Sequence, residues 1–208
     1  MYLEGDRWSA ALKERKVCCT KLWSVTAIVF CFSMLGGCDA CLFPNVAQLS
    51  ILEQGVDVWN QWREENPSSS TFFGCVDLSQ TNLVGVNFSG TELASTDLSD
   101  TNLEAADLTG AIAVSAWFVG ANLTMADLSG ASLIRANLRG AVMIGSNLAD
   151  TNLTFSNFAG ANLSHANISD VIGWQEIQDI SDCNIIEIEN APEGFREWAL
   201  ARGAVEIE

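Results

Sequence analysis

The chain has 208 residues and is 49% apolar, which is enough for one domain with a hydrophobic core and excludes wholesale disorder. Its formal charge is -16, and from residue 38 onward 23 acidic side chains face 5 basic ones, a net of -18 with no lysine. A surface of this charge repels nucleic acid and anionic lipid, so direct nucleic-acid binding is not expected.

Residues 22–35 form an uncharged apolar run preceded by basic residues. The run is shorter than the about 20 residues that span a membrane, and it fits the apolar region of an export signal. Leu35, Gly36, Gly37 and Cys38 follow, and this tetrad resembles the bacterial lipoprotein signal. The resemblance implies that residues 1–37 are the signal and that Cys38 is diacylated, because two acyl chains anchor far better than one.

Two alternatives to this N-terminal assignment stay open. Glu4, Asp6 and Glu14 dilute the positive charge before the apolar run, so translation could start downstream, at Val17. The run could also be an uncleaved anchor. Either way we expect the domain to face the periplasm, and an aspartate after the lipidated cysteine, here Asp39, resembles the signal for the inner rather than the outer membrane.

The cysteines do not predict a metal site. Cys38 and Cys41 form one C-x-x-C pair, without a second pair, and His165 is the only histidine. In an oxidising compartment a disulfide between Cys75 and Cys183, or between Cys41 and Cys75, is compatible with the sequence, and spacing does not choose between them.

Residues 38–70 are expected to form a tether and a helix. Within 46–65, apolar residues recur at spacings of three or four, with Asn45 as a candidate N-cap and Pro67 after the run. This pattern predicts one amphipathic helix.

Residues 71–170 repeat with a period of five. Every fifth position from 73 to 168 is a centre, occupied by thirteen Leu, four Phe, Met143, Ile168 and Ala113. The residue two before each centre is Ala, Thr, Ser or Val, and the residue just before it is Asn or Asp in fourteen cases. A period of five fits neither a helix at 3.6 nor a strand at 2, which excludes an ordinary amphipathic element.

The pattern A-(D/N)-L-x-x resembles the pentapeptide-repeat family. That resemblance implies an all-β solenoid, a right-handed quadrilateral β-helix of about five coils in which four fives make one coil and the central and small residues point inward. The Asn and Asp side chains are expected to bond the backbone at turns. Open ends of such a stack need covers, so we expect the helix to cap the first coil and residues 171–208 to form a small C-terminal β-α-β cap.

The sequence supplies no recognisable catalytic, cofactor-binding or metal-binding set, and we expect no enzyme activity. His165 falls at an outward corner of the repeat. Asp77 with Asp97, and Asp107 with Asp127, are expected to stack one coil apart as solvated carboxylates with turn roles.

Large apolar residues at outward positions break the repeat's rule. We expect them to form one candidate interaction patch, comprising Ile112, Val114, Trp117, Val119 and Ile134. Ala113 is small for a centre and predicts a distorted coil there. An alternative is that the N-terminal segment folds back over the patch.

These features favour a membrane-tethered scaffold or protein-binding module of a bacterial cell envelope, docking an unidentified protein or a second copy. The family resemblance supplies a second hypothesis, because acidic members act in the cytosol as DNA mimics that protect type II topoisomerases. The export signal argues against that second role.

Overall fold

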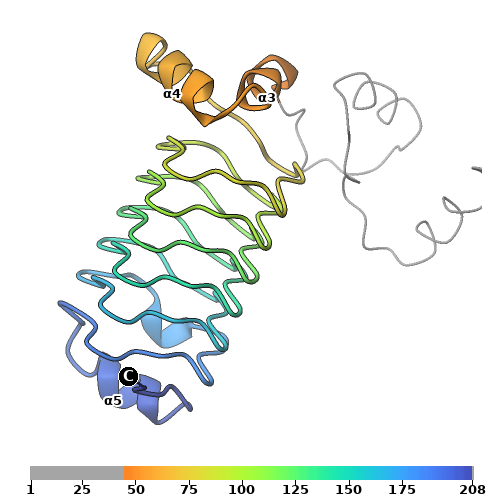
Figure 1. Ribbon diagram of the computed structural model, residues 1–208. Helices are drawn as coiled ribbons and strands as arrows, with labels where there is room; N and C mark the ends of the chain where they lie inside the picture. Colours follow the sequence, from red (N-terminus) through yellow and green to blue (C-terminus); the bar gives the residue numbers. More distant parts are fainter. Residues whose placement is uncertain (1–44, 208) are drawn as a thin grey trace, which may run out of the picture. The chain divides into compact units, whose positions relative to one another are not determined.

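The computed structural model describes residues 45–207, so the expectations for the signal, for Cys38 and for Cys41 lie outside the described residues. The described residues form one compact unit. Within it, helices α3 (Val46–Leu52) and α4 (Val56–Glu65) precede a stack of coils, and helix α5 (Phe195–Leu200) follows it (Figure 1).

The coils form a solenoid β-helix whose period is twenty residues. Parallel β-bridges join each residue that precedes a centre to the equivalent residue twenty positions later, from Phe72 with Glu92 to Asn152 with Ile172. We name the four sides by their first bridged residue: the first side starts at Phe72, the second at Asp77, the third at Asn82 and the fourth at Asn87. Four fives per coil are thus confirmed, and the right-handed sense stays a prediction.

Each five-residue unit ends in a tight turn. Each fifth residue from 75 to 170 has a φ between 53° and 67°, and eight of these twenty corner residues are glycine. The next N–H donates to the carbonyl three residues back, as Val76 N does to Phe73 O at 3.1 Å. Positive φ at the third turn position with this bond defines a type II turn. None of the twelve other corners is β-branched, as this conformation requires.

The central residues make the core, and each is at most 6% exposed. The expectation that Ala113 distorts its coil is wrong. Ala113 N donates to Ser132 O at 2.9 Å and Ser115 N to Ile134 O at 2.8 Å, as in neighbouring coils. Ala113 and the next centre in the same coil, Phe118, are both buried.

The Asn and Asp side chains before the centres bond the backbone, as expected. Asp77 Oδ1 accepts from Ser79 N at 2.9 Å, and the same contact recurs in most repeats. Some amides also link coils, since Asn167 Nδ2 donates to Asn147 Oδ1 at 2.9 Å. Thirteen of the fourteen residues, all but Asn82, make this turn contact, and that structural role accounts for their recurrence.

Two helices, rather than the single one expected, precede the coils. Gly55 has a φ of 120° and separates α3 from α4, a conformation that residues with a Cβ rarely adopt. Asn45 accepts from Gln48 N at 3.3 Å, as the N-cap of α3 should. From α4, Trp59 is fully buried, and its ring centroid lies 5.3 Å from that of Phe73 in the first coil.

Side chains of these helices pair with backbone groups at the open edge of the first coil. On the first side, Gln48 Nε2 donates to Ser70 O at 2.8 Å and Gln48 Oε1 accepts from Phe72 N at 3.3 Å. On the fourth side, Asn60 donates to Gly85 O and accepts from Asn87 N, at 2.9 and 2.8 Å. Two amide side chains thus supply hydrogen-bond partners that a preceding coil would otherwise provide.

Trp59 and Arg63 bond further backbone carbonyls at the same open edge, on the fourth side. Trp59 Nε1 donates to Asn87 O at 2.7 Å, and Arg63 Nη2 donates to Ser89 O at 2.6 Å. Burial lowers the pKa of the Arg63 guanidinium and nearby Asp107 raises it. Within the described residues, the Nε of Arg63 is the one buried side-chain polar atom without a hydrogen-bond partner.

The ladder continues past residue 170, where we expected the repeats to end. Asn157 bridges Asp179 with a spacing of 22, so this coil holds two additional residues, and η2 (Trp174–Glu176) lies in it. The coil runs on to Glu189, bridged to Asn167. After α5 the chain returns to bridge Val205 with Asn184.

Aromatic side chains pack at the C-terminal end. Phe195 of α5 is 2% exposed, and its ring centroid lies 5.6 Å from that of Trp174. Trp198 meets Trp174 edge-on at 5.4 Å. These contacts hold α5 against the last coil.

Candidate functional site

The predicted apolar patch lies around the corner between the first and second sides. Ile112 bridges Glu92 and Ser132 on the first side, and Trp117 bridges Asp97 and Asn137 on the second. Ile112 and Trp117 are 43% and 51% exposed, whereas Val114, Val119 and Ile134 are half-buried. Ile112 comes three residues before the Ser115 corner and Trp117 two residues after it, so the two exposed side chains lie on adjacent sides of one coil.

The structure adds residues that sequence analysis missed. Phe155 occupies a corner position two coils below Ser115, is 48% exposed, and lies under Arg135, whose guanidinium carbon is 5.9 Å from its ring centroid. Arg139 follows on the second side. A corner position accepts any side chain that is not β-branched, so the five-residue period does not mark Arg135 and Phe155 as unusual. The signal that could have found them is their spacing of twenty and forty residues from Ser115, which places them at the same corner of the stack.

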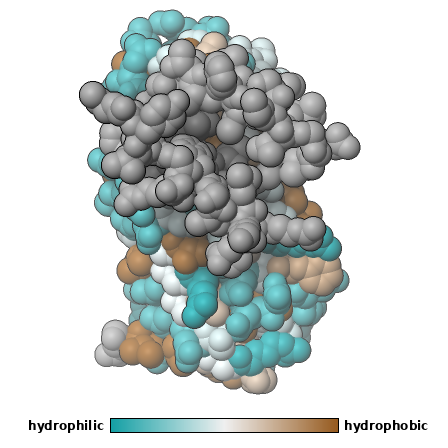
Figure 2. All heavy atoms as spheres, turned by 90° about the vertical axis from the view of Figure 1, so that its right-hand side faces the viewer, coloured by the Kyte–Doolittle hydropathy of each residue, from teal (hydrophilic) through white to brown (hydrophobic). Residues whose placement is uncertain are grey.

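Apolar side chains elsewhere are more isolated. Met125 is 65% exposed at the corner between the third and fourth sides. Figure 2 shows one face of the molecule, on which apolar side chains of the described residues are scattered among polar ones. Exposed apolar side chains that lie together, as at the corner between the first and second sides, can mark an interaction surface.

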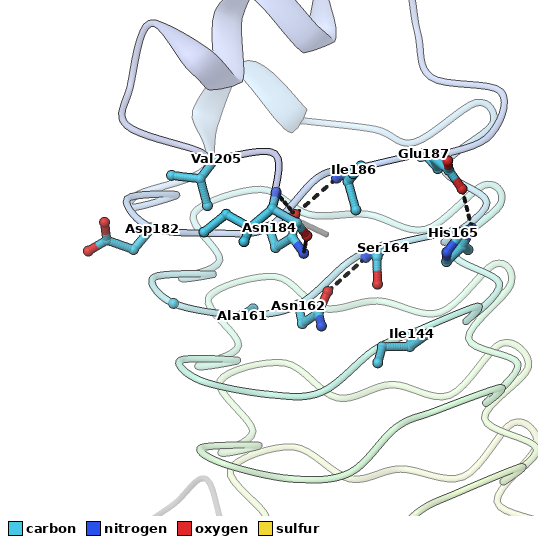
Figure 3. A pocket seen from close by; sticks show the side chains of 12 residues that line it. Ile144, Ala161, Asn162, Ser164, His165, Asp182, Asn184, Ile186, Glu187 and Val205 are labelled. Carbon is cyan, nitrogen blue, oxygen red and sulfur yellow. Dashed lines mark hydrogen bonds and ion pairs between the residues drawn. The ribbon is translucent and has the colours of Figure 1, made fainter.

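An open depression of about 690 Å³ lies on the third side near the C-terminal end (Figure 3). At one end His165 Nδ1 contacts Glu187 Oε2 at 3.1 Å, and both side chains are largely exposed. The depression's amides are already bonded, since Asn184 pairs with Ile207 and Asn162 Oδ1 accepts from Ser164 N. It therefore presents few free polar groups to a ligand.

The stacked carboxylates lie where the repeat predicts them. Asp77 bridges Asp97, and Asp107 bridges Asp127. Each accepts the N–H two residues onward, so each carboxylate serves its own turn. Across residues 45–207, no group of three or more His, Cys, Asp or Glu side chains is arranged to hold a metal ion.

The cysteines of the described residues differ in state. Cys75, at the corner between the first and second sides, is disulfide-bonded. Cys183 is a free thiol, buried in the small inward position of the sixth coil. Of the two bridges left open by the sequence, Cys75 to Cys183 is therefore wrong. Burial raises the pKa of the Cys183 thiol to about 12, so it is not a reactive nucleophile.

No described helix is long and apolar enough to cross a bilayer. The expected membrane attachment falls on residues before Asn45 and lies outside the described residues.

The repeat matches a known family model. The model described as Pentapeptide repeats matches residues 73–110 and 136–172 in eight copies, about a third of the chain. The protein thus contains pentapeptide repeats. The unmatched interval between the two segments holds Ile112, Trp117 and Ile134, although its backbone bonds are as regular as those of the matched coils. The departure there lies in the side chains.

Solved structures resemble parts of the chain. HetL, a pentapeptide repeat protein involved in heterocyst differentiation regulation from the cyanobacterium Nostoc sp. strain PCC 7120, is 29% identical over 58% of this chain and 52% of its own, with a TM-score of 0.34. The chain thus spans about half of HetL. Rfr23 from the cyanobacterium Cyanothece 51142 is 26% identical over 62% and 92%, with a TM-score of 0.41.

QnrB1, a plasmid-mediated fluoroquinolone resistance protein, is 16% identical over 61% of this chain and 86% of its own, with a TM-score of 0.31. No curated protein sequence matches the chain significantly. All three TM-scores are below 0.5, and the family model is what identifies the repeats.

Proposed function

We propose that this protein is a non-enzymatic, membrane-tethered scaffold or protein-binding module of a bacterial cell envelope. The observation that carries the proposal is the tetrad Leu35, Gly36, Gly37 and Cys38 directly after an apolar run of export-signal length. Acylation of Cys38 would hold the repeats at the periplasmic face of the inner membrane, as Asp39 favours.

The disulfide at Cys75 supports this location independently. Disulfides persist in oxidising compartments such as the periplasm and are rare in the cytosol. No lysine follows residue 38, and Asp77, Asp97, Asp107 and Asp127 bond the backbone of their own turns, which supports a binding role over catalysis.

The proposed working surface is the patch of Ile112, Val114, Trp117, Val119 and Ile134. A rigid coil stack fixes its side chains at constant spacing, which suits docking without reorganisation.

Intact mass tests the tether. The chain is expressed in a bacterium and extracted from membranes, beside Cys38→Ala. A product that starts at residue 38 with added acyl mass, lost in the variant, is the expected result. An unmodified full-length chain in the cytosol would overturn the proposal.

One observation favours a second function. The net charge of -18 after residue 38 suits a cytosolic DNA mimic that binds a type II topoisomerase. The disulfide at Cys75 weighs against it. If fractionation finds an unacylated cytosolic chain, binding to a purified type II topoisomerase is the assay to perform.

A further inference from the structure

The depression on the third side is lined by aliphatic side chains at outward positions. They are Ile144, Ile186, Val205 and Ile207. Val205 bridges Asn184 and so continues the third side beyond the sixth coil. Ile207 is 61% exposed, and the other three side chains are half-buried. Four aliphatic side chains of one side of the stack therefore meet in one open hollow.

The amides of the depression are already hydrogen-bonded within the chain. Asn184 Nδ2 donates to Ile207 O at 2.8 Å, and Asn184 Oδ1 accepts from Ile207 N at 3.1 Å. Asn162 Oδ1 accepts from Ser164 N at 3.0 Å. A partner in the depression would therefore contact it mainly through apolar groups.

Carboxylates lie at both ends of the depression. Asp182 occupies the corner before the third side and Glu187 the corner after it, and both side chains are exposed. Figure 3 shows Val205 and Ile186 between these two acids. Glu187 Oε2 contacts His165 Nδ1 at 3.1 Å, and among the described residues no lysine or arginine lines the depression.

The basic residues of the C-terminal end are engaged elsewhere. Residues 171–208 contain nine acidic residues and two basic ones, a net of -7. Arg196 Nη2 contacts Glu206 Oε1 at 2.5 Å, and the guanidinium carbon of Arg202 lies 4.5 Å from the ring centroid of Trp198. The depression thus offers an apolar surface between two carboxylates that neither of these arginines contacts.

We propose that this depression docks an extended segment of another protein in which an aliphatic side chain lies between two basic ones. Charge complementarity selects this occupant, because a second copy would bring another C-terminal end with a net charge of -7 against the first. The surface lies on a different side of the stack from Ile112 and Trp117. The inference rests on the binding role in the proposed function but not on its membrane tether.

The spacing of the two carboxylates sets the spacing of the cations. Asp182 and Glu187 are five residues apart, which is at most about 17 Å of chain. Alternate side chains of an extended segment face the same way, so basic residues at its first and fifth positions lie about 13 Å apart with the third position between them. A segment of the form K-x-I-x-K therefore matches the order of acid, apolar surface and acid.

A fluorescently labelled peptide of sequence SGKTITKGS provides the probe. Its binding to the purified full-length chain is measured by fluorescence anisotropy at low ionic strength. We expect the double variant Asp182→Asn, Glu187→Gln to weaken binding about tenfold, because it removes both charges. Ile186→Ser should weaken it about fivefold, since the aliphatic contact is lost.

The controls make the same chemical changes away from the depression. Asp150→Asn with Asp170→Asn removes two exposed carboxylates at the corner after the fourth side, and Ile112→Ser removes an exposed aliphatic side chain on the first side. Both control variants should bind the peptide as the wild type does. A peptide with glutamate in place of both lysines should not bind. Thermal unfolding followed by circular dichroism verifies that each variant is folded.

The outcomes separate this inference from the proposed function. Absence of peptide binding, or equal binding by the wild type and the double variant, overturns the inference. Self-association of the chain that Ile186→Ser abolishes would show that a second copy occupies the depression, and would also overturn it. Intact mass reports on the tether separately, so an acylated chain that does not bind the peptide contradicts this inference alone. An unacylated chain that binds it contradicts only the tether.

Discussion

At the residue scale, each five-residue unit imposes distinct demands on its positions. The centre must be large and apolar, the residue two before it small, and the corner free of β-branching because its φ is positive. Sequence analysis predicted the first two demands from the period. It did not detect that Phe155 and Met125 become exposed, because a corner constrains the backbone conformation and leaves the identity of an unbranched side chain open.

Cys183 allows one residue-scale prediction. Burial raises its pKa from 9.0 to about 12, so the folded state holds the thiol proton more tightly than the unfolded state. The contribution of the protonated Cys183 thiol to the free energy of unfolding is complete below about pH 9 and is lost as the pH rises towards 12. No lysine or tyrosine follows residue 38, which leaves this window nearly free of other titrations.

We therefore expect the free energy of unfolding to fall less in Cys183→Ala than in the wild type as the pH rises from 9 to 12. Alanine is the commonest occupant of the small inward position, so the variant should fold. Urea unfolding at each pH measures the difference. Parallel pH profiles for the two chains would contradict the prediction.

At the element scale, the ends of the stack were harder to predict than its middle. The apolar spacing indicated a helix over 46–65 but not its interruption at Gly55. Gln48 and Asn60 bond backbone groups at the open edge of the first coil. No sequence pattern distinguishes these two amides from amides that face solvent. Two additional residues shift the sixth coil out of the register of the other five, so only its repeat at Cys183, Asn184 and Ile185 can be recognised from the sequence.

Asn60 tests the edge pairing. Asn60→Ala removes the partners of Gly85 O and Asn87 N, and we expect it to lower the free energy of unfolding by about 1 kcal/mol. The matched control is Gln61→Ala, one residue later on the exposed face, where the amide contacts only Glu65. Urea unfolding of both variants provides the comparison, and equal stabilities would show that the edge does not depend on the Asn60 amide.

At the scale of the whole molecule, acidic side chains far outnumber basic ones. The net charge of -18 after residue 38 is spread over a unit with two ion pairs among its described residues, His165 with Glu187 and Arg196 with Glu206. Self-repulsion of that size destabilises a compact state, and salt screens it.

The melting temperature should therefore rise with sodium chloride concentration. Circular dichroism at low and high ionic strength, with sucrose as an uncharged co-solute control, checks this. A melting temperature that falls with added salt would mean that attractive pairs outweigh the repulsion.

The regular winding also fixes the directions in which residues of different coils face relative to one another. Cys75 and Ser115 are forty residues apart, which is two complete turns of a twenty-residue coil, so both face the same direction. Deleting or inserting one five-residue unit between them would preserve every inward side chain downstream and rotate the patch of Ile112, Val114, Trp117, Val119 and Ile134 by a quarter turn relative to Cys75. A change of twenty residues between Cys75 and Ser115 therefore leaves both facing the same direction, whereas a change of five residues moves the patch to the neighbouring side of the stack.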